Sequence, residues 1–252
     1  MEIIKTRQSR PPRILIHAAH GLGKSSLAAA APNPLFIQTE DGLENIDASA
    51  FSLCQDFETM MEQLGQVYRE DHDYKTLVID SLDWTETLVY KHVCKEAGKK
   101  SLSEFEYGGG YVKALEQFNW LVRALTDIRD KLGMIIIITA HSQVKTYHNP
   151  MGSDYDRHQI KLRDKNAELF LEWCDLVSFL HFQTFTKKKT KKESGGFAGD
   201  KAKGIGGSER VLSCVPSAAY VSKNRYGIIS DISIPTPDEG WENIVKAIKG
   251  EA

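Results

Sequence analysis

Short continuous apolar runs alternate along the chain with longer segments whose apolar residues recur at helical spacing. The runs at 13–17, 35–38, 76–80 and 134–139 are typical of strands buried on both faces. Helical patterns occupy 25–31, 56–69, about 82–97, 111–132, 164–174 and 238–249. This alternation predicts an α/β fold with a mainly parallel central sheet and helices on both of its faces.

The pattern is less regular in the remaining segments. Residues 51–54 predict a short strand, Gly108–Gly110 break the chain before the long helix, and the polar segment 143–160 predicts a loop. Segments 175–186 and 209–220 predict a late β-hairpin. Between them, a basic and glycine-rich insertion at 187–207 buries little apolar surface, and we expect it to be flexible. We expect one domain over residues 1–252.

Charge and cysteine usage narrow the class of protein. The net charge of −2 is uneven, because 187–210 carries seven lysines and one arginine against three acids. This is compatible with an acidic body that carries a basic arm at 187–210, suited to binding anions. The four cysteines lack metal-ligand spacing and fit a reducing cytosol. No run is long enough to span a bilayer, so we expect a cytoplasmic protein without a membrane partner.

The segment between the first predicted strand and the first predicted helix has the order of a phosphate-binding loop. Gly21, Gly23, Lys24 and Ser25 match its motif, whereas Ala18 stands where glycine is usual. Loop amides and a helix N-terminus favour phosphate, with lysine on the β- and γ-phosphates and serine on Mg²⁺. The expected ligands are ATP and Mg²⁺, contacted by Ala19, His20, Gly21, Leu22, Gly23, Lys24, Ser25 and Ser26.

Further polar residues come at the ends of other predicted strands. Ligands of open α/β sheets bind beyond these carboxyl ends. Asp80 would hold Mg²⁺ with Ser25, although an acid there is also suited to capping the next helix. Glu40 would orient the attacking water, with Asp41 as its competitor. His141 would sense the γ-phosphate, with Gln143 as the second choice and an ordinary hydrogen-bonded histidine as the alternative.

Lys223 and Arg225 lie in a late Lys-x-Arg-x-Gly segment. Being two residues apart in an extended segment, they project to the same side. A catalytic role for them requires a neighbouring subunit, whose active site one of them would enter as an arginine finger. The alternative is an ordinary solvated turn.

Together these motifs resemble RecA-type ATPases, especially small phage-encoded RecA-like proteins of the single-strand-annealing (Sak-type) class. The matching pieces are 18–25, 36–42, 77–81, 139–143 and 223–227, and the last is also similar to a segment of replicative ring helicases. The resemblance implies a RecA-like P-loop NTPase that assembles on DNA as a ring or filament. It also implies Glu40 as the catalytic carboxylate and Lys223 and Arg225 acting in trans.

In the resembling family the loops after the mid-sheet strands face DNA, and here they correspond to 105–111 and 143–160. Cations and aromatic rings in such loops can bind phosphates and stack on unpaired bases. The candidate DNA contacts are Lys145, Tyr147, Arg157 and His158, joined by the arm residues Lys187, Lys188, Lys189, Lys191 and Lys192. On composition alone, the arm is equally well read as a solvated loop.

Three functions remain open. The first is a DNA-stimulated ATPase that binds single strands and promotes annealing or strand pairing in phage-type recombination or replication. The second is a nucleotide-gated loader or adaptor that contacts a helicase, a single-strand-binding protein or another replication protein. The third is a P-loop kinase for a small molecule, which would require an acceptor pocket.

Overall fold

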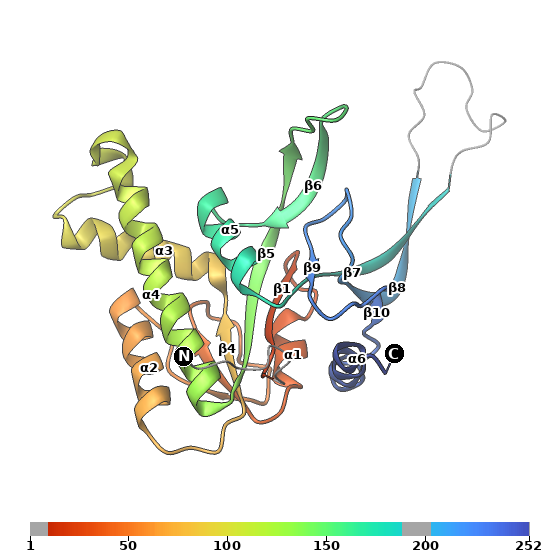
Figure 1. The fold of residues 1–252 in the computed structure, drawn as a ribbon, viewed down its shortest axis with the longest axis horizontal. Helices are drawn as coiled ribbons and strands as arrows, with labels where there is room; N and C mark the ends of the chain where they lie inside the picture. Colours follow the sequence, from red (N-terminus) through yellow and green to blue (C-terminus); the bar gives the residue numbers. More distant parts are fainter. Residues whose placement is uncertain (1–9, 188–202, 252) are drawn as a thin grey trace, which may run out of the picture.

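The computed structural model describes residues 10–187 and 203–251, with the backbone alone for 184–187 and 203–206. One sheet runs through the molecule in the strand order β10-β8-β7-β1-β5-β4-β2-β3 (Figure 1). The strands from β3 to β7 in this order are parallel, and β8 and β10 add to the β7 edge in antiparallel pairing. The strand bounds are β1 Arg13–Ala18, β2 Pro34–Gln38, β3 Ser49–Ala50, β4 Thr76–Asp80, β5 Ile135–Tyr147, β6 Tyr155–Ile160, β7 Leu176–Lys187, β8 Lys203–Ser213, β9 Lys223–Asn224 and β10 Ile232–Ser233.

Helices cover both faces of this sheet. Their bounds are α1 Lys24–Ala29, α2 Phe57–Arg69, α3 Leu82–Glu96, α4 Gly109–Leu132, α5 Asp164–Trp173 and α6 Pro237–Lys249. Helices α2, α3, α4 and α5 pack into one core, and α1 and α6 pack into the other. The mainly parallel α/β fold with a late antiparallel hairpin is therefore confirmed.

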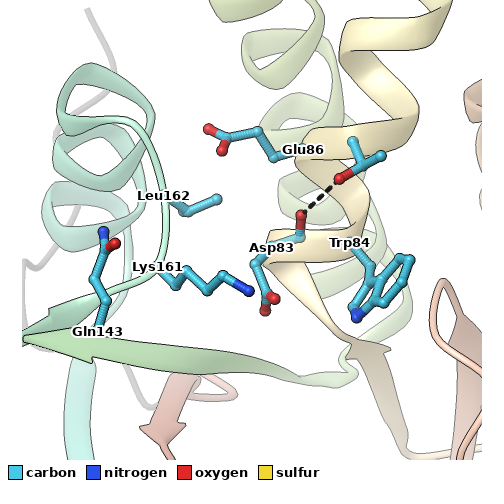
Figure 2. Close-up of a pocket in the computed structure, with 7 residues that line it drawn as sticks. Asp83, Trp84, Glu86, Gln143, Lys161 and Leu162 are labelled. Atoms are coloured by element: carbon cyan, nitrogen blue, oxygen red, sulfur yellow. Dashed lines mark hydrogen bonds between the residues drawn. The ribbon is translucent and has the colours of Figure 1, made fainter.

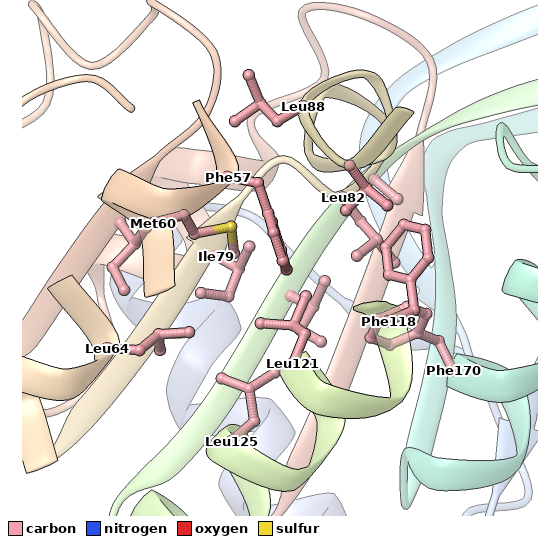
Figure 3. Close-up of a cluster of buried hydrophobic side chains, with 14 of the residues drawn as sticks. Phe57, Met60, Leu64, Ile79, Leu82, Leu88, Phe118, Leu121, Leu125 and Phe170 are labelled. Atoms are coloured by element: carbon pink, nitrogen blue, oxygen red, sulfur yellow. The ribbon is translucent and has the colours of Figure 1, made fainter. Parts of the chain in front are cut away.

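The two cores explain why the predicted strands are apolar without interruption. Successive side chains of a strand point to opposite faces, so Leu77 and Ile79 enter the first core while Val78 enters the second. In the first core, Phe118 of α4 meets Phe170 of α5 edge-on at 5.6 Å between ring centroids (Figure 3). The sheet thus lies between two apolar layers, which leaves the ends of its strands as the positions for polar functional groups.

The prediction of a loop at 143–160 is wrong, because most of this segment forms a β-hairpin. Strand β5 continues past the sheet to Tyr147, turns, and returns as β6 in a register from Ser142 opposite Ile160 to Tyr147 opposite Tyr155. This hairpin projects from the body of the molecule beside α5 (Figure 1). Its residues are mostly polar because it lies outside both cores, so no apolar alternation marked it as strand.

Other boundaries also differ from the sequence prediction. The glycine run interrupts regular structure only as far as Gly108, because Gly109 and Gly110 already belong to α4. The short strand expected at 51–54 lies instead at Ser49–Ala50, although Phe51 and Cys54 still donate backbone hydrogen bonds to β2. The second strand of the late hairpin is Lys203–Ser213, so it begins inside the insertion expected at 187–207 and ends before residue 220. Two short 3₁₀ turns, η1 Leu102–Glu104 and η2 Glu106–Gly108, precede α4.

Candidate nucleotide-binding site

The loop between β1 and α1 has the backbone that phosphate binding requires. Gly21 has φ 72° and Gly23 has φ 88°, and this left-handed region favours glycine. Gly23 caps the N-terminus of α1, so free amides of the first turn face the loop. Ala18, at the usual glycine position, is the last residue of β1 and is fully buried in the second core. Its methyl group therefore packs in the interior, which accounts for the departure from the motif.

A pocket of about 470 Å³ opens beside this loop. It brings together most of the residues predicted for the nucleotide and for its hydrolysis: His20, Gly21, Gly23, Lys24, Ser25, Ser26, Glu40, Asp80 and His141. Ala19 and Leu22 do not line it. The Ala19 carbonyl accepts a hydrogen bond from Lys24 Nζ at 3.2 Å, and Leu22 packs against the second core.

The electrostatics of the pocket centre on Lys24, which is almost fully buried. Burial lowers the pKa of its ammonium, while the carboxylates of Asp80, Asp83 and Glu40 act in the opposite direction. A triphosphate would supply the compensating negative charge that a buried lysine needs.

The donor set also suits magnesium. Asp80, at the end of β4, accepts a hydrogen bond from Thr139 Oγ1, and the Ser25 hydroxyl lies in the same pocket. Within 10–187 and 203–251, no cluster of three or more histidine, cysteine or acidic side chains could hold a metal alone. Mg²⁺ typically takes one or two protein oxygens and completes its shell with phosphates and water. Ser25 and Asp80 fit that requirement.

Glu40 is held where β2 and β4 end. Thr39 Oγ1 donates to the Ser81 carbonyl at 2.6 Å and accepts from the Ser81 amide at 2.9 Å. The Ser81 hydroxyl then donates to Glu40 Oε2 at 3.1 Å. With its side chain 30% exposed, the Glu40 carboxylate is oriented by protein and still accessible to water.

His141 lies in the pocket, stacked on His20 with 3.9 Å between ring centroids. Its Nδ1 is 3.0 Å from Asp83 Oδ2 and 3.9 Å from Glu40 Oε2. Burial would raise the pKa of Asp83, but hydrogen bonds from the ring and backbone amide of His141 outweigh it and hold that pKa below its usual value. Asp83, in the first turn of α3, is a site residue that the sequence analysis did not assign to the nucleotide site.

Gln143, the second choice as sensor, lies in a different pocket. This pocket of about 360 Å³ separates the first turns of α3 from the end of β6, and the Lys161 side chain extends toward Asp83 in it (Figure 2). The Lys161 amide also donates to the His141 carbonyl at 2.8 Å. Asp83 therefore lines this second pocket while bonding to His141 of the first.

Lys223 and Arg225 lie away from the phosphate loop of their own chain. Lys223 Nζ donates to the carbonyls of Leu171 and Glu172 at 2.8 and 2.6 Å. Arg225 forms a 3.0 Å ion pair with Asp175, which precedes β7 and pairs with Arg13 at the start of β1. The phosphate loop follows the carboxyl end of β1. These two cations therefore lie at the opposite, amino-terminal end of the parallel strands. Their role in trans stays a prediction.

The candidate DNA residues fall into three groups. Lys145, Tyr147 and Arg157 lie on the hairpin, where the Arg157 guanidinium stacks 4.1 Å from the Tyr147 ring centroid and Lys145 pairs with Asp164. His158 instead stacks on Phe179 at 4.8 Å, which favours a packing role. Lys187 is described as β7 backbone only, and Lys188, Lys189, Lys191 and Lys192 lie outside the described residues.

The phosphate loop after β1, the acid that ends β4 and the carboxylate after β2 define the class of P-loop nucleoside triphosphatases. A family model described as an AAA domain matches residues 10–226, and the chain belongs to that family. Domains of this class typically bind and hydrolyse ATP with Mg²⁺. No curated protein matches the sequence. Among the helices in the described part of the chain, none has the length and apolar character needed to span a membrane.

Proposed function

We propose that the protein is an ATPase that binds single-stranded DNA and promotes annealing or strand pairing in phage-type recombination or replication. The observation that carries the proposal is the course of β5. Inside the sheet this strand bears His141, which lines the nucleotide pocket, and four to six residues further it bears Lys145 and Tyr147 of the hairpin. A shift of His141 on loss of the γ-phosphate would therefore be transmitted along one continuous strand to the hairpin.

The chemistry proposed is attack of water on the γ-phosphate. Lys24 stabilises the charge that develops on the transferred group, and Ser25 and Asp80 hold Mg²⁺. Glu40 orients the water, and support for this role comes from its fixed and partly exposed carboxylate. His141 reports the state of the γ-phosphate and is positioned by Asp83.

The proposed DNA surface is a groove of about 620 Å³ between the hairpin, α5 and the segment 216–222. Its lining includes Lys145, Tyr147, Arg157 and Tyr220. Arg157 Nε is buried without a hydrogen-bond partner within the described residues, although polar groups so buried are normally paired. The accessible part of the guanidinium offers donors to phosphate oxygens, while the aromatic rings offer stacking surfaces for unpaired bases.

ATP turnover measured during a titration with single-stranded DNA tests the proposal. The wild type should turn over ATP faster with DNA, and Lys24→Ala should abolish turnover. Tyr147→Ala with Arg157→Gln should keep the basal rate and lose the stimulation, whereas Lys249→Ala, at an exposed position of the last turn of α6, should behave as wild type.

Two further readouts separate the alternatives. Absence of both DNA binding and DNA-stimulated turnover would contradict the proposal. If nucleotide state then controlled capture of a replication protein, a loader or adaptor would be the better interpretation. Labelled ATP should yield free phosphate, whereas a phosphorylated acceptor would identify a kinase.

A further inference from the structure

Arg210 of β8 lies against the phosphate loop, although it is 186 residues from Lys24 in the sequence. A Cβ atom built on Gly23 would lie 2.8 Å from Arg210 Nη1, so the end of the guanidinium lies directly against this glycine of the loop. Its Nη2 donates a 3.2 Å hydrogen bond to the Pro235 carbonyl. One nitrogen thus fixes the side chain to a turn, and another faces the loop.

The strand geometry directs this side chain. Arg210 is the cross-strand partner of Phe182, and the register of the β7–β8 pair shifts directly after this partner, between Phe182 and Thr184. Irregularities of this kind bend a strand locally and re-aim its side chains. The position of Arg210 over Gly23 is therefore fixed where the β7–β8 ribbon changes register.

Charge pairing distinguishes Arg210 from three arginines at the amino-terminal end of the parallel strands. Arg13, Arg129 and Arg225 all pair with Asp175, at the end of the parallel strands away from the phosphate loop. None of the ion pairs formed within the described residues includes Arg210. Gly23, against which it lies, precedes Lys24 and the first amides of α1, which also attract anions. A cation in such a place is favoured when an anion is bound.

We propose that Arg210 binds the polyphosphate of the nucleotide within its own subunit. The planar guanidinium offers several N–H donors in a fork that matches phosphate oxygens. The contact would bring a residue of the late hairpin to the phosphate loop. This inference rests on the P-loop class of the protein and is independent of any role in DNA binding.

Displacement of a fluorescent nucleotide in the absence of DNA tests the inference, with ATP and inorganic tripolyphosphate as competitors. A hydrogen-bonded charge contact predicts that Arg210→Gln weakens both competitors by the same factor, about 10- to 100-fold. Arg210→Lys should fall between this variant and the wild type, because it keeps the charge without the fork. Arg69→Gln removes an exposed arginine of α2 and should leave both affinities unchanged.

The alternative is that Arg210 only fastens the Pro235 turn. An unchanged ATP affinity in Arg210→Gln would overturn the inference. So would a loss for ATP without an equal loss for tripolyphosphate, because the contact would then be to the base or ribose. Thermal unfolding of each variant, measured in parallel, identifies any loss that comes from the fold; Arg210→Lys provides the comparison if Arg210→Gln unfolds.

Discussion

Glu40 is placed to orient water because a short chain of hydrogen bonds holds it. Thr39 and Ser81 bridge the ends of β2 and β4, and the Ser81 hydroxyl donates to the Glu40 carboxylate. We expect Glu40→Gln to retain ATP binding, because its oxygens do not form the phosphate loop. Turnover should fall about 10²- to 10⁴-fold, the usual contribution of a positioned general base.

Single-turnover kinetics and a nucleotide-binding assay check this expectation for Glu40→Gln. Asp41→Asn is the matched control, because Asp41 is its sequence competitor and does not line the pocket. If Asp41→Asn lost turnover and Glu40→Gln kept it, the assignment would pass to Asp41.

His17, on β1 just before the phosphate loop, should make stability depend on pH. It is fully buried between Ser142 Oγ at 2.8 Å and the Val221 carbonyl at 2.7 Å. Burial lowers its pKa from 6.5 to about 4, which the bond to Val221 only partly offsets. The unfolded chain therefore binds a proton more readily. Stability present above pH 6.5 is lost as pH falls toward 4.

Urea unfolding at pH 7 and pH 5 measures this effect. The His17 contribution to the loss of unfolding free energy should be about 2 kcal/mol over that interval. His17→Asn should show a correspondingly smaller difference between the two pH values, whatever its absolute stability. An unchanged pH dependence in this variant would exclude His17 as the source.

Residues of the site differ in how much of their position is encoded locally. Asp80 ends an apolar strand and Lys24 follows the loop after another, so the sequence alone indicates that they meet at the carboxyl ends of the strands. Asp83 and Arg210 carry no such signal, because their partners are His141 and Gly23, far along the chain. An acid in the first turn of a helix and an arginine in a strand are ordinary locally, and only the sheet order brings them to the loop.

At the scale of elements, burial decided what could be predicted. Strands inside the sheet are apolar because both of their faces are covered, and α2 to α6 present one apolar side, so these elements were predicted within a few residues. The hairpin of β5 and β6 is stabilised by backbone pairing outside the cores. Its exposed positions carry polar side chains on both faces, and such a segment resembles a loop until its register is known.

The first core predicts a strong contrast within a single helix. On α4, Phe118 is fully buried against Phe170, whereas Trp120 is 57% exposed. Phe118→Ala should destabilise the protein by about 3–5 kcal/mol, through lost burial and the cavity left behind. Trp120→Ala should change stability by about 0.5 kcal/mol or less. Chemical denaturation of the two variants measures both values, and equal losses would contradict the packing described.

At the scale of the whole molecule, the position of Arg225 raises the question of assembly. Arg225 is half-exposed and lies at the end of the parallel strands away from its own phosphate loop, so a catalytic role requires a second copy. If Lys223 and Arg225 act in trans in a ring or filament, an interface joins one subunit's loop to another subunit's Arg225. Subunits lacking Lys24 can then still supply Arg225 to a neighbour.

Mixing two inactive variants tests this arrangement. Lys24→Ala and Arg225→Gln should each be inactive alone. An equimolar mixture with single-stranded DNA should recover up to about a quarter of wild-type turnover, since half of the intact loops gain an intact neighbour. Because Arg225 also pairs with Asp175, thermal unfolding of Arg225→Gln must remain close to that of the wild type. A folded Arg225→Gln variant with full activity, or a mixture without recovery, would restrict Arg225 to its ion pair with Asp175.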